Sequence, residues 1–127
     1  IRSMHAVCET HAFRRAAAQA GMSEDEIAAL VGYLAGNPDA GDVIAGSGGC
    51  RKLRWAGRGK GKSGGYRTIT FYSGALMPVY LLTVFGKGEK ANLSDAECNA
   101  LRALTKALTA EHRNVVAALA TRKGKMR

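Results

Sequence analysis

The chain has 127 residues, of which 46% are hydrophobic, and its 19 Lys and Arg against 10 Asp and Glu give a formal net charge of +9. This length suits one domain with one core, the hydrophobic content excludes wholesale disorder, and the charge leaves nucleic acid, an anionic membrane or an acidic protein as the expected partner. Three widely spaced cysteines without a CxxC pair indicate neither a zinc site nor a disulfide framework, and they fit a reducing, cytoplasmic setting. No apolar run approaches the length of a membrane span, and no signal peptide is expected, because the start of the chain lacks a long apolar segment.

The N-terminal region predicts a short strand followed by a helix. Residues 5–9 (HAVCE) favour the strand. Thr10 is a suitable N-cap for an alanine-rich helix that runs to about Ala20, where Gly21 ends it.

A second helix has stronger start and stop signals. Ser23 and Glu26 form a capping-box pattern, with three acidic residues in the first turn, where the helix dipole favours them. One apolar stripe recurs at helical spacing: Ile27, Leu30, Val31 and Leu34. Gly36 and Pro38 end the helix, and residues 37–49 form a turn-rich connector.

Three strand-like segments follow, at residues 50–55, 66–72 and 79–85. In the first, Leu53 and Trp55 alternate with Lys52 and Arg54, which puts the apolar pair on one face and the cations on the other. The second is β-branched and aromatic, and its alternation does not settle whether Arg67 shares the cationic face. The third is apolar on both sides and is expected to be the central, buried strand.

The last element predicted is a helix. Ser94 and Glu97 repeat the capping-box pattern, and Leu93 is placed to pack on Cys98. Apolar residues continue at helical spacing through a long segment: Leu101, Leu104, Leu108, Val115 and Leu119.

The order of elements predicts an α+β fold with the helices on one face of an antiparallel sheet. No internal repeat or linker divides the chain, so residues 1–127 are expected to form a single domain, with a core at about 5–120 and a basic tail at 121–127.

The segment between the first two strands is strongly cationic. Seven cations and no acid occur from residue 51 to residue 67: Arg51, Lys52, Arg54, Arg58, Lys60, Lys62 and Arg67. A field of one sign this dense repels itself, so the segment is expected to face a polyanion. Its glycines match GxGxxG, but a strand follows where a nucleotide site needs a helix, and Ala56 stands where a P-loop needs glycine. A basic loop that contacts RNA or DNA backbone is therefore favoured over a nucleotide-triphosphate site.

Few residues offer ordinary acid–base chemistry. The three histidines lie outside the cationic segment, and the sequence contains no evident carboxylate pair or metal-ligand cluster. Cys50 lies beside two cations, which can lower a thiol pKa, but a small packed side chain is the favoured interpretation. Lys and Arg can clamp a phosphate and stabilise a pentacovalent transition state, while RNA supplies its own 2′-hydroxyl nucleophile. The composition is compatible with a metal-free ribonuclease, but on composition alone phosphate binding without cleavage is the more common outcome.

Three motifs taken together resemble a known family: GGCRKLRW (48–55), KGKSGGYR (60–67) and KGEKANLS (87–94). Over residues 5–110 the chain resembles the RelE/HigB superfamily of bacterial type II toxin–antitoxin toxins, in particular its HigB-like branch. The resemblance implies a RelE/ParE-like fold: a small twisted, mainly antiparallel sheet with two N-terminal helices packed on it and a C-terminal helix at one edge.

The same resemblance implies an activity and partners. RelE-type toxins are ribosome-dependent mRNA endonucleases (mRNA interferases), in which the 2′-hydroxyl of the messenger attacks its own phosphodiester with no metal or other cofactor. The implied partners are mRNA, the ribosomal A site and a HigA-like helix-turn-helix antitoxin, with no membrane. A ParE-like gyrase inhibitor and a non-catalytic RNA- or ribosome-binding module stay as alternatives.

Site residues also follow from the resemblance. Five positions match the catalytic ones: Lys52, Arg54, Arg67, Lys87 and Lys90. Gly88 stands where RelE has an arginine, and Leu93 and Ser94 stand where it has a tyrosine, so the general acid and base stay unassigned. Further RNA contacts are expected from Arg51, Arg58, Lys60, Lys62, Tyr66 and Tyr72.

Overall fold

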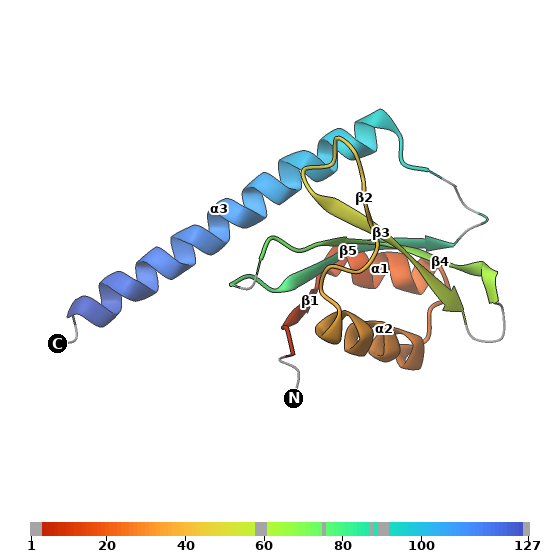
Figure 1. Ribbon diagram of the computed structural model, residues 1–127, viewed down its shortest axis with the longest axis horizontal. Helices are drawn as coiled ribbons and strands as arrows, with labels where there is room; N and C mark the ends of the chain where they lie inside the picture. The colour runs from red at the N-terminus through yellow and green to blue at the C-terminus, as the bar shows by residue number, and fades with distance from the viewer. Residues whose placement is uncertain (1–3, 58–60, 75, 87, 89–91, 126–127) are drawn as a thin grey trace.

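The computed structural model describes residues 4–57, 61–74, 76–86, 88 and 92–125, and it shows one sheet between two helical layers (Figure 1). The elements in chain order are β1 (Val7–Glu9), α1 (His11–Gln19), α2 (Glu24–Gly36), β2 (Asp42–Val43), β3 (Cys50–Gly57), β4 (Gly61–Phe71), β5 (Val79–Gly86) and α3 (Asp95–Lys125). The five strands lie in the order β1-β5-β4-β3-β2, with β1 parallel to β5 and the other pairs antiparallel. The predicted α+β fold is confirmed.

The two N-terminal helices begin at the predicted caps. The Thr10 hydroxyl oxygen accepts a hydrogen bond from the Phe13 amide at 3.1 Å, and the hydroxyl donates to the Leu81 carbonyl at 2.8 Å. Thr10 therefore ties the start of α1 to β5 as well as capping it. In α2 both capping-box bonds are present, between Ser23 and Glu26.

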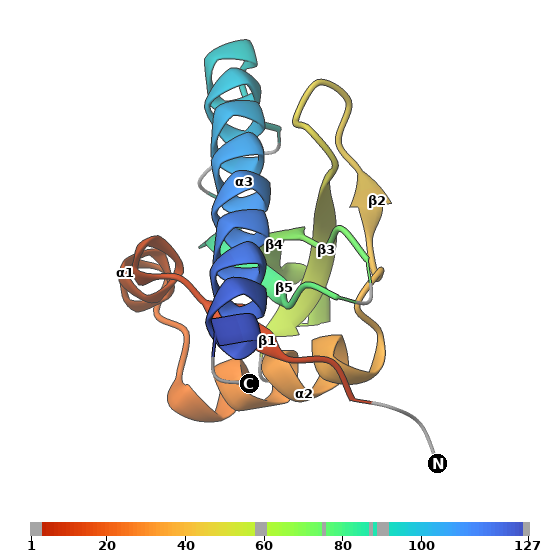
Figure 2. The ribbon, with the colours of Figure 1, turned by 90° about the vertical axis from the view of Figure 1, so that its left-hand side faces the viewer.

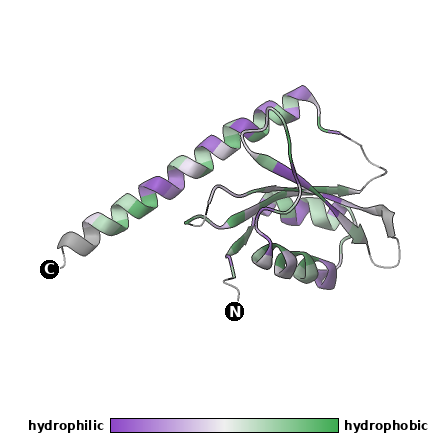
Figure 3. Cartoon of the chain, in the orientation of Figure 1, coloured by the Kyte–Doolittle hydropathy of each residue, from purple (hydrophilic) through white to green (hydrophobic). Residues whose placement is uncertain are grey.

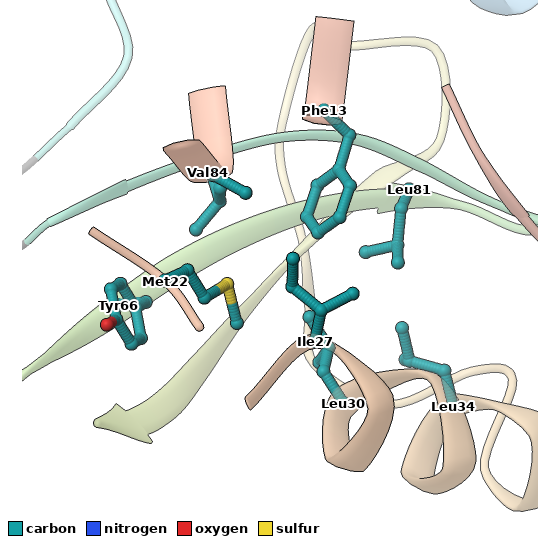
Figure 4. Close-up of a cluster of buried hydrophobic side chains, with 9 residues drawn as sticks. Phe13, Met22, Ile27, Leu30, Leu34, Tyr66, Leu81 and Val84 are labelled. Atoms are coloured by element: carbon teal, nitrogen blue, oxygen red, sulfur yellow. The ribbon is translucent and has the colours of Figure 1, made fainter. Parts of the chain in front are cut away.

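Both of these helices pack on the same face of the sheet. Their apolar stripes meet residues of β4 and β5 in one cluster (Figure 4), which consists of Phe13, Ala17, Met22, Ile27, Leu30, Leu34, Tyr66, Leu81 and Val84. Leu53 and Trp55 of β3 pack against this cluster, as the alternation along their strand predicts.

The third helix lies on the opposite face, so the expectation that all helices cover one face is wrong for α3. Leu101 and Leu108 of α3 pack against a second cluster, formed by Cys50, Ile69, Phe71, Met77, Leu82 and Phe85. An antiparallel sheet can leave one face to solvent. Here β4 and β5 carry apolar side chains on both faces, so helices must cover both faces of the sheet. The capping box at Ser94 and Glu97 is confirmed by its two hydrogen bonds, of 2.8 and 3.1 Å.

The sheet differs from the predicted one in two details. The central strand is β4 rather than β5, although β5 is also interior, between β4 and β1. The connector at residues 37–49 contains β2, a strand of only two residues, which pairs with β3.

The C-terminal half of α3 projects away from the sheet (Figures 1 and 2). All residues from 113 to 121 are exposed, including the hydrophobic Val115, Val116 and Leu119. The hydropathy colours of Figure 3 show hydrophobic stretches along this projecting part of the helix. The helix continues to Lys125 through most of the predicted basic tail. Among the helices described, none combines the length and the apolar character that crossing a membrane requires.

Candidate nucleic-acid interface

Cations of β3 line the face of the sheet on which α3 also lies. Since Leu53 and Trp55 point toward α1 and α2, the alternating Lys52 and Arg54 point to the other side. Arg54 is exposed and Lys52 is half-buried.

Strand pairing brings Arg67 onto this same face. Arg67 alternates with Ile69 and Phe71, which belong to the cluster under α3, and it pairs directly with Arg54 on β3. On its other side Arg67 pairs with Phe85 of β5, so the three side chains form a row across three strands. This row, Arg54–Arg67–Phe85, is here called the arginine row.

The guanidinium of Arg67 is held in an unusual state. Arg67 is only 7% exposed to solvent, and its Nη1 atom is buried without a hydrogen-bond partner among the residues described. Buried polar atoms are nearly always hydrogen-bonded, and two like charges facing each other across a strand pair are destabilising. Without a ligand, this arrangement lowers the stability of the fold. An anionic oxygen ligand would accept a hydrogen bond from Nη1 and offset the repulsion between the two arginines.

The next row along the strands contains Lys52, Ile69 and Thr83. Asp42 of β2 pairs with Lys52 from the edge of the sheet, so an acid stands at the rim of the cationic face. No ion pair of Lys52, Arg54 or Arg67 is present within the described part of the chain. The sequence did not predict that Asp42 lies beside Lys52, because the strand that holds Asp42 is only two residues long and lies in a turn-rich segment.

Neither predicted tyrosine lies beside Arg67. The Tyr66 side chain is buried under the opposite face, where its hydroxyl donates to the Glu26 carboxylate at 3.2–3.3 Å. Burial, and then the charge of Glu26, raise the pKa of Tyr66. Tyr72 follows the end of β4, and its hydroxyl lies 3.1 Å from Nε2 of His5. Tyr66 is a core residue, and Tyr72 belongs to a different part of the surface.

The remaining predicted contacts divide into three groups. Arg51 points to the face of α1 and α2, and its Nη1 donates to the Gly41 carbonyl at 3.2 Å. Lys62 lies in β4 near the hairpin that joins β3 to β4. Four predicted residues lie outside the part of the chain that the structure describes: Arg58, Lys60, Lys87 and Lys90.

Cys50 begins β3 on the same face, but it is fully buried. Burial raises the pKa of its thiol to about 11, and the nearby Ser47 hydroxyl only partly offsets this. The neighbouring cations therefore do not activate the thiol, and the interpretation as a packed cysteine is supported. Among the residues described, no group of three or more His, Cys, Asp or Glu side chains is arranged to hold a metal ion.

Comparison with protein families identifies the family of the chain. Residues 5–126 match the model of the family described as the RelE toxin of the RelE / RelB toxin-antitoxin system. The match runs through all three helices and all five strands, and it confirms the resemblance at the level of the superfamily.

Proposed function

Because the chain belongs to the RelE toxins of RelE/RelB toxin–antitoxin systems, we propose that it cuts messenger RNA in the ribosomal A site, without a metal ion or other cofactor. The observation that carries the proposal is the arginine row, in which Arg54 and Arg67 face each other on neighbouring strands. Two like charges in register destabilise a sheet, whereas they stabilise the extra negative charge of a phosphodiester in its transition state.

The proposed reaction is an internal transesterification. The 2′-oxygen attacks the adjacent phosphorus, the bond from phosphorus to the 5′-oxygen breaks, and the products are a 2′,3′-cyclic phosphate and a 5′-hydroxyl. The proton leaves the 2′-hydroxyl for a base, and an acid returns one to the 5′-oxygen. Arg67 holds the scissile phosphate with its planar donors, and Arg54 adds a second charge from the adjacent strand. The proposed general base and general acid come from three lysines: Lys52, Lys87 and Lys90.

Dependence on the ribosome has a physical rationale in the make-up of the face. The arginine row and its neighbouring row contain no imidazole, so the rate would rest on charge stabilisation and on alignment of the 2′-oxygen with the leaving oxygen. A messenger held in the A site arrives already constrained, whereas a free RNA strand must lose that conformational freedom on the toxin.

A cleavage assay with purified components tests the proposal. Messenger RNA is incubated with the protein, with and without programmed ribosomes, and the new ends are mapped and chemically typed. Cuts that require ribosomes and leave a 5′-hydroxyl are expected. An intact messenger in the presence of ribosomes and active protein would refute it.

The partner proposed for this toxin is a HigA-like helix-turn-helix antitoxin, as the HigB-like motifs suggest. An acidic segment of such a partner would neutralise Lys52 and Arg54 on the open part of the face. Co-expression with the neighbouring reading frame should relieve toxicity, and reversing the charges of Lys52 and Arg54 to Glu should weaken the complex.

A non-catalytic RNA- or ribosome-binding module is the second candidate, because the described face holds cations without an imidazole. It predicts tight, salt-sensitive ribosome binding with an intact messenger. A ParE-like gyrase inhibitor has less support, because such proteins lack the catalytic residues of RelE, whereas β3 and β4 here keep a dense set of cations.

A further inference from the structure

A second cationic groove lies along α3, away from the arginine row. It has a volume of about 650 Å³ and runs between residues 102–113 of α3, the Gly48–Gly49 turn and the end of β4. Its charged lining consists of Arg102, Lys106 and Arg113, and no Asp or Glu is among the residues that line it. We call it the α3 groove.

The three cations share one side of the helix. Spacings of four and seven residues return a side chain to the same face, and all three side chains are exposed. They therefore form a charged wall about 11 residues long, or about 16 Å at 1.5 Å per residue.

The opposite wall is built tightly against the helix. Gly48 has a φ of +79°, and a Cβ at this position would collide with the Thr105 hydroxyl and lie 3.2 Å from the Cα of Arg102. Thr105 is itself buried, and its hydroxyl donates to the Arg102 carbonyl at 3.0 Å. The close approach of turn and helix holds the groove in one shape.

An aromatic ring stands at one end of the groove. Tyr72 lines it, and the ring is held by the hydrogen bond to His5 and by an edge-on contact with the imidazole at 5.3 Å between centroids. A fixed aromatic ring beside a row of cations is the arrangement with which proteins bind single-stranded nucleic acid, through base stacking and phosphate contacts.

The groove also lies within reach of the arginine row. Phe71 lines the groove and points to the same face of β4 as Arg67, four residues away. At about 3.3 Å per residue this separation is roughly 13 Å. A single RNA strand can therefore contact both places at once.

We propose that the α3 groove binds the phosphodiester backbone of a single-stranded segment of RNA, with one base stacked on Tyr72. The inference builds on the proposed function, since it extends the surface that holds RNA beyond the arginine row. The segment belongs either to the messenger or to ribosomal RNA, which present the same chemistry to the groove.

Binding measurements on the full chain test the inference separately from cleavage. A fluorescent single-stranded RNA with 2′-O-methyl sugars, which lacks the attacking hydroxyl, is titrated at several salt concentrations. The double variant Lys106→Gln/Arg113→Gln should bind about 10-fold or more weakly, and the slope of log affinity against log salt should fall by roughly 1.4, about 0.7 for each lost phosphate contact.

A matched control removes the same charge elsewhere. Arg14 and Arg15 are exposed on α1, so Arg14→Gln/Arg15→Gln lowers the net charge equally and should leave both affinity and slope nearly unchanged. Tyr72→Phe keeps the ring and its edge-on contact with His5 and should retain most of the affinity, whereas Tyr72→Leu should bind roughly 5- to 100-fold more weakly. Thermal unfolding of each variant shows whether the fold is intact.

Ribosome binding distinguishes the two sources of RNA. If the groove variants lose affinity for both the short RNA and the small ribosomal subunit, the groove binds any single strand. If they lose affinity for the subunit alone, the groove binds ribosomal RNA. Both outcomes support the inference. Unchanged affinity of the groove variants for both ligands, absence of binding by the wild type, or weakened binding of an antitoxin only would overturn it. A protein that cuts no RNA but shows the expected binding losses would refute the proposed function and leave the groove assignment standing.

Discussion

At the scale of single residues, Arg67 and Cys50 are two buried side chains on the same face of the sheet, and their burial has different consequences. Both are buried on the side of α3. The thiol is kept neutral by burial, as its raised pKa shows. The guanidinium keeps its charge, because an arginine is not deprotonated in proteins, and so its burial has to be offset by a ligand or borne by the fold.

Replacing Arg67 should therefore separate stability from activity. Arg67→Met keeps the volume and removes a buried charge that faces Arg54, so the free energy of unfolding should stay equal or rise by about 1 kcal/mol. Messenger cleavage should fall by a factor of about 100 or more, because a phosphate clamp is lost. Urea unfolding and the ribosome assay measure the two effects.

The conservative variant completes this test. Arg67→Lys keeps the charge and loses the planar, two-pronged geometry, so it should regain little of the activity. Full activity in Arg67→Lys would mean that charge alone matters at this position, and a strongly destabilised Arg67→Met would assign Arg67 to the fold instead.

Cys50 predicts a loss of stability at high pH. An acid whose pKa is raised from 9.0 to about 11 in the folded protein binds its proton more tightly there than in the unfolded chain. Its contribution is complete below pH 9 and is lost as the pH rises toward 11, by at most about 1.4 kcal/mol for each pH unit. Urea unfolding between pH 8 and 11 should show this decline, and Cys50→Ala should show a smaller one. An equal decline in the two proteins would exclude Cys50 as its cause.

At the scale of elements, the features predicted from sequence are those set by neighbours along the chain. The capping boxes at Ser23 and Ser94 are confirmed, because each needs only a residue three positions away. The face of Leu53 and Trp55 is confirmed because alternation is a property of one strand.

Features that depend on pairing between strands were beyond prediction. Alternation placed Arg67 on a face of β4, but only the register with β3 sets it opposite Arg54. Likewise Tyr66 has an ordinary strand sequence around it, and only the position of Glu26 on α2 explains where its hydroxyl goes. The α3 groove joins a turn to a helix more than 50 residues later, although the spacing of its three cations was visible in the sequence.

The close approach of Gly48 to α3 predicts a loss of stability when this glycine is replaced. An alanine there must adopt a φ of +79° and also push against Thr105, so Gly48→Ala should lower the free energy of unfolding by roughly 2–4 kcal/mol. Gly46 is the matched control, since it has a φ of +76° with no atom within 4 Å of an added Cβ. Gly46→Ala should cost about 1 kcal/mol, the strain of the backbone alone. Equal losses in urea unfolding would show that the turn does not press on α3.

At the scale of the whole molecule, α3 divides into an anchored half and a free half. Leu101 and Leu108 pack against the second cluster, whereas the residues from 113 to 121 are all exposed. The RelE family match nevertheless includes the free half.

Shortening the helix should therefore leave the fold nearly intact. A chain that ends at Asn114 loses only exposed side chains from its described part, so its free energy of unfolding should change by less than about 1 kcal/mol. Leu108→Ala, in the anchored half, should cost about 1–3 kcal/mol, because that side chain packs in the second cluster. A large loss on truncation, measured by urea unfolding, would show that the free half supports the domain.

The parallel pairing of β1 with β5 has a consequence for synthesis of the toxin. Val7 pairs with Val79, and Thr10 donates to the carbonyl of Leu81, so the first strand has no partner until the fifth has been made. Contacts this distant in sequence slow folding, because the closing of the long loop precedes the contacts that repay its entropy. A nascent chain therefore cannot complete the sheet, or the arginine row that ends at Phe85, until the ribosome that the toxin is proposed to attack has made β5.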